Sequence, residues 1–196
     1  MKIVLIYTPR CGSTSIFKYF SKLKPEYECI NEPWFGWMNY NVDHRKYRYK
    51  DIILKGNVFI KTTYKNLPET CERFIDDFDK VIFLLRRNLK EQIESSLYTH
   101  TTQSFLDYSK RKYWIDNDEI EEFSKQHIYY DNEIRRSAIL YDKPLFYYED
   151  LYYGDFKPLF EELGIGFDEK YFNEYLDKSN RYRTGTLECN NEKRLI

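Results

Sequence analysis

The run Lys2–Tyr7 (KIVLIY), followed at once by a polar loop, is the feature that most limits what this chain can fold into. A continuous apolar run of this length is typical of a strand that is buried on both faces of a parallel sheet. After the loop Thr8–Gly12, apolar residues return at helical spacing at Ile16, Phe17, Phe20 and Leu23. The chain therefore begins with a predicted strand, a phosphate-type turn and a helix.

Strand and helix patterns alternate along the rest of the chain, which favours an α/β domain with a mainly parallel sheet. We predict further strands at residues 27–31, 57–64, 80–86 and 145–148, and helices at 68–78, from 89, at 118–140 and at 156–163, with Gly164 as a C-cap. We expect one domain over residues 1–196, with a P-loop-like central parallel β-sheet flanked by helices. Residues 33–56 lack periodicity and are interpreted as a loop or lid, and residues 180–196 as a C-terminal tail.

The charges of the chain nearly cancel. Lysine and arginine number 31 against 32 aspartates and glutamates, which gives a net charge of −1. Such a chain has no overall field that would attract nucleic acid or an anionic membrane, so any anion site has to be local. The opening apolar run is too short for a signal-peptide core or a membrane span, and a cytoplasmic location is expected. The cysteines have no paired spacing and are expected to be free thiols: Cys11, Cys29, Cys71 and Cys189.

The first loop and the start of the next helix read TPRCGSTS over residues 8–15. Gly12 allows the backbone to curl around an anion, and the first N–H groups of the helix are unpaired donors at the positive end of its dipole. Ser13 and Thr14 add hydroxyls, and Arg10 adds a planar cation. These features predict a phosphate or sulfate site.

Spacing argues against two common kinds of anion loop. A P-loop requires GxxxxGK[ST], and neither that lysine nor that spacing is present, which disfavours a magnesium-dependent kinase or NTPase. A phosphatase loop pairs a cysteine with an arginine six residues later, where this chain has Phe17. Cys11 is therefore interpreted as a small side chain packed in the turn, not as a nucleophile.

Three motifs, in order along residues 2–165, resemble those of PAPS-dependent sulfotransferases (PAPS is 3'-phosphoadenosine 5'-phosphosulfate). TPRCGST is similar to the family's 5'-phosphosulfate loop, which is commonly TPRSGST. LRRNLKEQIESS resembles its 3'-phosphate motif, with Arg87 and, eight residues later, Ser95 in the matching places. FYYEDL, followed by a helix that ends in ELGI, resembles a late strand and helix of the family. The resemblance implies transfer of a sulfuryl group from PAPS to an acceptor, with PAP as the other product.

The resemblance also implies which residues bind the donor. The 5'-phosphate and sulfate would lie against the loop residues Arg10, Cys11, Gly12, Ser13, Thr14 and Ser15. Arg87 and Ser95 would hold the 3'-phosphate, with Arg86 as the alternative to Arg87. Ser15 stands where many members have an aromatic residue that stacks on adenine.

One later segment matches the family less closely. In RYRTGT, Arg183 and Gly185 match a further contact to the 3'-phosphate, and a frayed basic tail is the alternative interpretation. Glu149 and Asp150 of the YEDL segment could pass for a catalytic pair. Since neighbours on a strand face opposite ways, we assign both to structure.

Sulfuryl transfer needs a base for the acceptor's proton and cations for the oxygens that become negative, but no metal. Glu32 lies in NEPW after the second predicted strand. An EP at this place resembles carbohydrate and trehalose-type sulfotransferases, in which that glutamate is the base; a solvated loop glutamate is the alternative. Arg10 and Lys61 are the candidate cations, and an exposed strand-end lysine fits Lys61 equally well. The histidine base of phenol-type members, in KTH, is replaced here by Thr63.

The resemblance implies a hydroxyl or amine of a small molecule or carbohydrate as the acceptor, and the aromatic and basic side chains of residues 33–56 would suit a sugar or an aromatic acceptor. A lid that packs its own small core is the alternative interpretation of these side chains. Three other functions stay open: a catalytically inactive homologue that binds PAP or PAPS, a nucleotide or nucleoside kinase-like enzyme, and a nucleic-acid-binding module, which the balanced charge disfavours. No oligomeric state is inferred.

Overall fold

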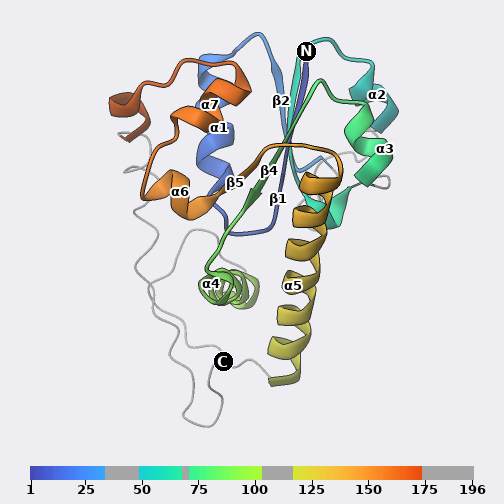
Figure 1. The fold of residues 1–196 in the computed structure, drawn as a ribbon, viewed down its shortest axis with the longest axis vertical. Helices are drawn as coiled ribbons and strands as arrows, with labels where there is room; N and C mark the ends of the chain where they lie inside the picture. Colours follow the sequence, from blue (N-terminus) through green and yellow to red (C-terminus); the bar gives the residue numbers. More distant parts are fainter. Residues whose placement is uncertain (34–48, 68–70, 103–116, 174–196) are drawn as a thin grey trace.

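The computed structural model describes residues 1–33, 49–67, 71–102 and 117–173. Its strands are β1 (Lys2–Tyr7), β2 (Glu28–Asn31), β3 (Val58–Thr63), β4 (Lys80–Leu85) and β5 (Leu145–Tyr147). They pair in parallel and form one sheet in the order β2-β3-β1-β4-β5 (Figure 1). The predicted α/β class, with a parallel sheet flanked by helices, is confirmed.

Helices cover both faces of this sheet (Figure 1). One face carries α1 (Ser13–Leu23), α6 (Tyr148–Tyr152) and α7 (Lys157–Leu163), and the other carries α2 (Tyr49–Ile53), α3 (Cys71–Asp76) and the long α5 (Asn117–Leu140). A short 3-10 helix, η2 (Tyr64–Asn66), follows β3, and α4 (Leu89–Thr102) lies beyond the carboxyl end of the sheet. No helix in the described ranges is long and apolar enough to cross a membrane.

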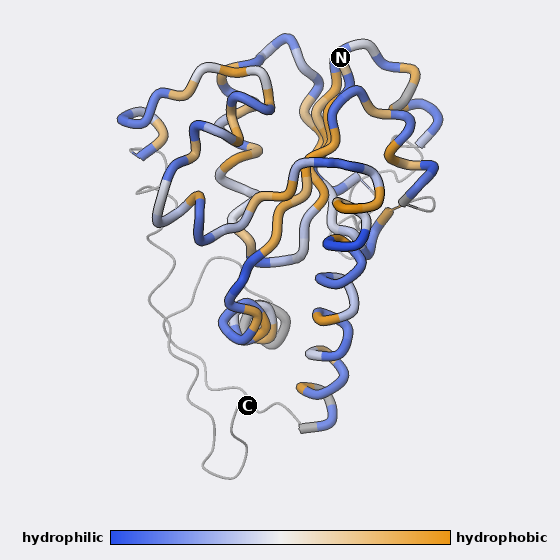
Figure 2. Tube along the Cα trace, viewed as in Figure 1, coloured by the Kyte–Doolittle hydropathy of each residue, from blue (hydrophilic) through white to orange (hydrophobic). Residues whose placement is uncertain are grey.

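The alternation of side chains along β1 builds two cores. Ile3, Leu5 and Tyr7 belong to the core on the side of α1 and α7, whereas Val4 and Ile6 belong to the core on the side of α3 and α5. Each of these side chains is at most 3% exposed, because a central parallel strand is covered on both faces. Figure 2 shows the resulting band of hydrophobic residues along the strands, with mostly hydrophilic residues on the outer sides of the helices.

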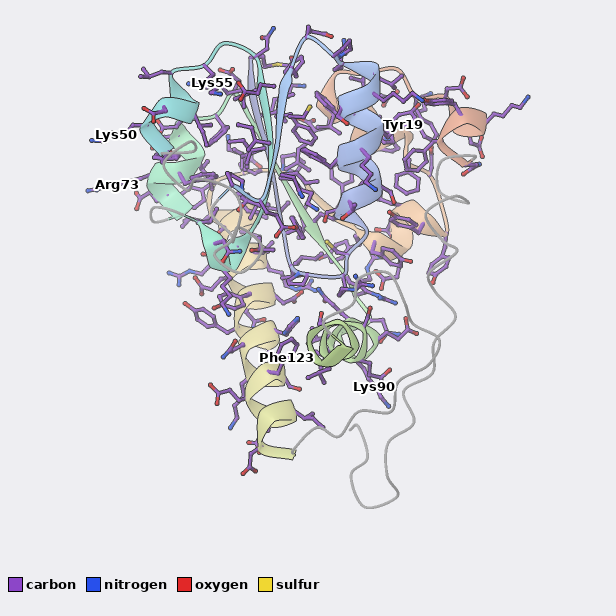
Figure 3. The ribbon with its side chains drawn as sticks, turned by 180° about the vertical axis from the view of Figure 1, so that it is seen from behind. Tyr19, Lys50, Lys55, Arg73, Lys90 and Phe123 are labelled. Carbon is purple, nitrogen blue, oxygen red and sulfur yellow. The ribbon has the colours of Figure 1, made fainter. Side chains whose placement is uncertain are left out.

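Aromatic side chains fill the core beside α1. Phe160 of α7 is fully buried, and its ring centre lies 4.8 Å from that of Tyr19 and 5.3 Å from that of Phe172. Figure 3 shows Tyr19 projecting from the side of α1. Gly164 directly follows the last residue of α7, and its left-handed φ of 74° lets the next N–H, that of Ile165, donate to the Phe160 carbonyl oxygen at 2.9 Å. The predicted C-cap is confirmed.

Helix α4 is held in place by α5. Phe123 lies between the two helices (Figure 3) and packs against the small cluster that contains Leu97. His127 is buried next to it, and its Nε2 lies 3.2 Å from the Ser96 hydroxyl. Burial lowers the pKa of His127, so its ring is neutral at pH 7 and the packing of α4 on α5 contains no buried charge at this point.

Two finer predictions are wrong. Within residues 33–56, predicted as a loop or lid, residues 49–53 form α2; the Tyr49 ring stacks on Phe74 at 5.5 Å, and Ile52 is fully buried. A helix this short has too few apolar positions to reveal its period. The strand predicted at 145–148 ends at Tyr147, and the next residues form α6. The other lid residues 34–48 and the tail 180–196 lie outside the described residues.

The strand order shows that the chain builds first one side of the sheet from β1 and then the other. After β1 the chain adds β2 and β3 on one side of it, and then β4 and β5 on the other side. The connections therefore diverge at β1, and open parallel sheets bind ligands at such a point. The loop of residues 8–12 lies there.

Candidate active site

The loop after β1 closes tightly against α6. Gly12 has a left-handed φ of 80°, and its carbonyl oxygen accepts hydrogen bonds from the Ser15 N–H (3.2 Å) and the Tyr152 hydroxyl (2.7 Å). Helix α1 begins at the next residue, Ser13, with no side-chain cap and no acidic residue in its first turn. The start of α1 is therefore an electropositive end without a carboxylate of its own.

Replacing Gly12 with alanine is expected to destabilise the fold by about 1–3 kcal/mol, the usual cost of a side chain on a left-handed backbone. The new Cβ would also lie 2.5 Å from the Tyr152 hydroxyl oxygen and overlap its ring. Urea unfolding followed by circular dichroism measures the loss. Gly56→Ala is the matched control, because among the described residues, its two chain neighbours apart, no atom lies within 4 Å of a Cβ placed there. An equal loss in both variants would contradict the explanation.

Helix α4 holds the first part of the same loop. The Gln92 side-chain amide is fully buried and donates to the Thr8 hydroxyl and the Pro9 carbonyl oxygen, both at 2.6 Å. About one helical turn later, the Ser95 hydroxyl accepts a 2.8 Å hydrogen bond from Nε of Arg10. Helix α4 therefore brings together the two sequence motifs that were predicted to bind the two ends of one nucleotide.

Four polar side chains meet beside this loop, and we call them the strand-end cluster: Tyr7, Thr14, Glu32 and Lys61. Nζ of Lys61 lies 3.4 Å from Oε1 of Glu32 and 3.1 Å from the Thr14 hydroxyl. The Tyr7 hydroxyl donates to the same oxygen of Glu32, and the Lys61 ammonium lies 5.0 Å from the centre of the Tyr7 ring. The Glu32 N–H also donates to the Lys61 carbonyl oxygen at 2.7 Å, which fixes the two backbones side by side.

Burial shifts the pKa values of Lys61 and Tyr7 in the strand-end cluster. The Lys61 side chain is 3% exposed and that of Glu32 is 21% exposed. Burial lowers the pKa of Lys61, and the Glu32 carboxylate opposes this shift by stabilising the ammonium. Burial, and then the charge of Glu32, holds the pKa of Tyr7 well above its usual value, so the phenol stays protonated and remains a donor. The alternative of an exposed strand-end lysine at Lys61 is excluded.

The backbone is strained at two of the candidate residues. Arg10 has a φ of 67° and Glu32 a φ of 46°; the third non-glycine residue with a positive φ among those described is Asp142. Such backbone is costly for a residue with a side chain, and it persists where the surrounding structure enforces it, often at functional sites. A solvated loop glutamate does not account for a strained, partly buried Glu32 with two side-chain partners.

Other groups engage the predicted 3'-phosphate arginine. Arg87 forms a two-point ion pair with Asp150, one contact being 2.6 Å, and its guanidinium lies 4.1 Å from the centre of the Tyr147 ring. Glu149 accepts the backbone N–H groups of Arg87 and Asn88, each at 2.9 Å. The strand geometry predicted for Glu149 and Asp150 is wrong, because both residues lie in helix α6. Their carboxylates contact residues of the connection between β4 and α4.

The remaining candidate residues differ in their surroundings. Cys11 is fully buried, and burial raises the pKa of its thiol to about 12, so the thiol is neutral at pH 7. Ser13 and Thr63 are buried, and the Thr63 hydroxyl has no hydrogen-bond partner within the described part of the chain. Arg183 and Gly185 lie outside the described residues. In the ranges that the structure describes, no three His, Cys, Asp or Glu side chains gather in a way that could hold a metal ion.

Sequence reasoning missed three residues that shape this site: Tyr7, Gln92 and Tyr152. Tyr7 ends β1 after four aliphatic residues, which places a polar tip at the carboxyl edge of the sheet. Gln92 precedes Ser95 by about one helical turn, so helical spacing places both on one face. Tyr152 gave no local signal, because its hydrogen bond to Gly12 joins residues 140 positions apart.

No protein-family model matches this chain, and no curated protein matches it significantly. The arrangement itself combines a helix start without a carboxylate, the cations Arg10 and Lys61, and the carboxylate of Glu32 at one edge of the sheet. Such a set of groups can bind a phosphate or sulfate, stabilise negative charge that develops on its oxygens, and take a proton from a nucleophile.

Proposed function

We propose that this chain is a PAPS-dependent sulfotransferase, which transfers a sulfuryl group from PAPS to a hydroxyl, or an amine, of a small-molecule or carbohydrate acceptor. The proposal rests chiefly on the strand-end cluster, in which Lys61 lies 3.4 Å from Oε1 of Glu32 and 3.1 Å from the Thr14 hydroxyl. This contact brings a buried cation and a carboxylate to the start of α1, where the sequence resembles a phosphosulfate loop.

The donor would be held at two places. Its 5'-phosphosulfate would lie against the start of α1, near Gly12 and Thr14, where the helix dipole favours an anion. Its 3'-phosphate would bind Arg87 and Ser95. The hydrogen bond of 2.8 Å from Arg10 to Ser95 supports this assignment, because it links the two places through a cation.

In the proposed reaction, Glu32 takes the proton of the acceptor hydroxyl while the hydroxyl oxygen attacks sulfur. The new S–O bond forms, the bond from sulfur to the bridging phosphate oxygen breaks, and PAP leaves with that electron pair. Lys61 stabilises the charge on the departing oxygen. Tyr7 and Lys61 both contact Oε1 of Glu32, so Oε2 is the atom to which we assign the proton. The proton then passes to solvent.

Calorimetric titration with PAP, with ADP, and with ATP plus magnesium tests the donor site without knowledge of the acceptor. We expect PAP to bind at least about tenfold more tightly than ADP, because a 3'-phosphate adds charge-assisted hydrogen bonds. Transfer from labelled PAPS is then assayed against acceptors that carry hydroxyls or amines. Preference for ATP with magnesium would overturn the proposal in favour of a kinase-like enzyme, and PAP binding without transfer to any acceptor would favour an inactive homologue.

A further inference from the structure

Two neighbouring carboxylates of α6 hold the connection between β4 and α4, and they act on different groups. Glu149 is 21% exposed and accepts the backbone N–H groups of Arg87 and Asn88, each at 2.9 Å. Asp150 instead binds the Arg87 guanidinium with both of its oxygens. The Glu149 carboxylate therefore fixes the main chain of this connection, whereas the Asp150 carboxylate binds the side chain of Arg87.

The ion pair between Arg87 and Asp150 is open to solvent. The two side chains are 50% and 54% exposed, and the Tyr147 ring lies 4.1 Å from the guanidinium. A guanidinium binds a carboxylate or a phosphate through the same pair of N–H groups. Because water screens an exposed ion pair, the pair adds little stability, and a phosphate with more negative charge can replace the carboxylate.

We propose that Asp150 competes with the donor's 3'-phosphate for the guanidinium of Arg87, and so sets how strongly the protein prefers nucleotides that carry this phosphate. The inference rests on the proposed function. In this structure the Asp150 carboxylate occupies the two N–H groups of Arg87 beside Tyr147. A bound 3'-phosphate takes these N–H groups, and Asp150 turns to solvent. Glu149 holds the main chain in place during the exchange.

Asp150→Asn removes the competing charge and keeps the size of the side chain. We expect this variant to bind PAP about two- to fivefold more tightly than the wild type, the range for loss of an exposed ion pair. Affinity for ADP, which lacks the 3'-phosphate, should be unchanged; calorimetry measures both. Glu91→Gln is the matched control. Glu91 is 53% exposed and pairs with the adjacent Arg86, so its loss removes an equal charge nearby without releasing Arg87.

The possible outcomes separate this inference from the proposed function. Weaker PAP binding by Asp150→Asn would mean that Asp150 orients Arg87 for the phosphate. Equal tightening in Glu91→Gln would mean either a general effect of charge or binding of the phosphate by Arg86. Each of these results overturns the competition. If the wild type binds PAP and Asp150→Asn binds it equally well, the competition is overturned but the proposed function is not. If the wild type does not bind PAP, the competition and the proposed function are both overturned. With Arg87→Ala already present, Asp150→Asn should have no effect.

Discussion

Glu32→Gln is expected to lower the rate of sulfuryl transfer by about 10²- to 10⁴-fold, the usual contribution of a general base. Glutamine has nearly the same size, and its carbonyl oxygen can still accept from Tyr7 and contact Lys61 as Oε1 does in the wild type. It cannot take a proton at neutral pH. PAP affinity should therefore change little while turnover falls. Steady-state rates with the best acceptor and calorimetry with PAP measure the two quantities separately.

Glu28→Gln is the matched control for this variant. Glu28 lies at the other end of β2, is 47% exposed and pairs with Lys55, so its replacement should leave both transfer and PAP binding unchanged. Near-normal transfer in Glu32→Gln would show that another group acts as the base. A parallel loss of PAP affinity would show that Glu32 chiefly supports the position of Lys61.

Phe160→Ala is expected to lower the free energy of unfolding by about 3–5 kcal/mol, the usual cost of removing a large buried aromatic side chain. The Phe160 ring is fully buried, and its centre lies 4.8 Å from that of Tyr19 and 5.3 Å from those of Phe167 and Phe172. Its removal would leave a cavity between α1 and α7 that these rigid rings cannot fill. Urea unfolding of the wild type and the variant measures the difference.

Tyr153→Ala is the control for aromatic content. Tyr153 lies just beyond α6 and is 75% exposed, so the free energy of unfolding should change by less than about 0.5 kcal/mol. A cost for Phe160→Ala as small as that of the control would contradict the placement of Phe160 at the centre of the core beside α1.

Most of the sheet could be predicted from the sequence because two of its central strands, β1 and β4, are largely apolar runs with distinct ends. Both are buried along almost their full length, as a continuous apolar sequence favours. Helix α2 could not be predicted in the same way. It has five residues, too few to be stable alone, and it depends on the contact of Tyr49 with Phe74, which lies beyond the range of any local pattern.

The position of the candidate site could be predicted, but the partners of its side chains could not. Gly12 and the first turn of α1 are local features, so the sequence alone predicted the tight turn after β1 and the helix that follows it. Arg10 and Arg87 instead contact residues 85 and 63 positions away in the chain. The direction of a long side chain depends on such distant partners. For this reason the sequence predicted Arg87 and Ser95 on one phosphate, whereas in the structure they bind Asp150 and Arg10.

Side chains from two helices form hydrogen bonds with both ends of the loop after β1. Gln92 binds its first residues, Thr8 and Pro9, and Tyr152 binds Gly12 at its end. A segment restrained in this way has little conformational entropy left to lose, so the affinity for an anion would not be reduced by the cost of ordering the backbone. Association would then follow the rate of diffusional encounter, with no slow closing of this loop to delay it.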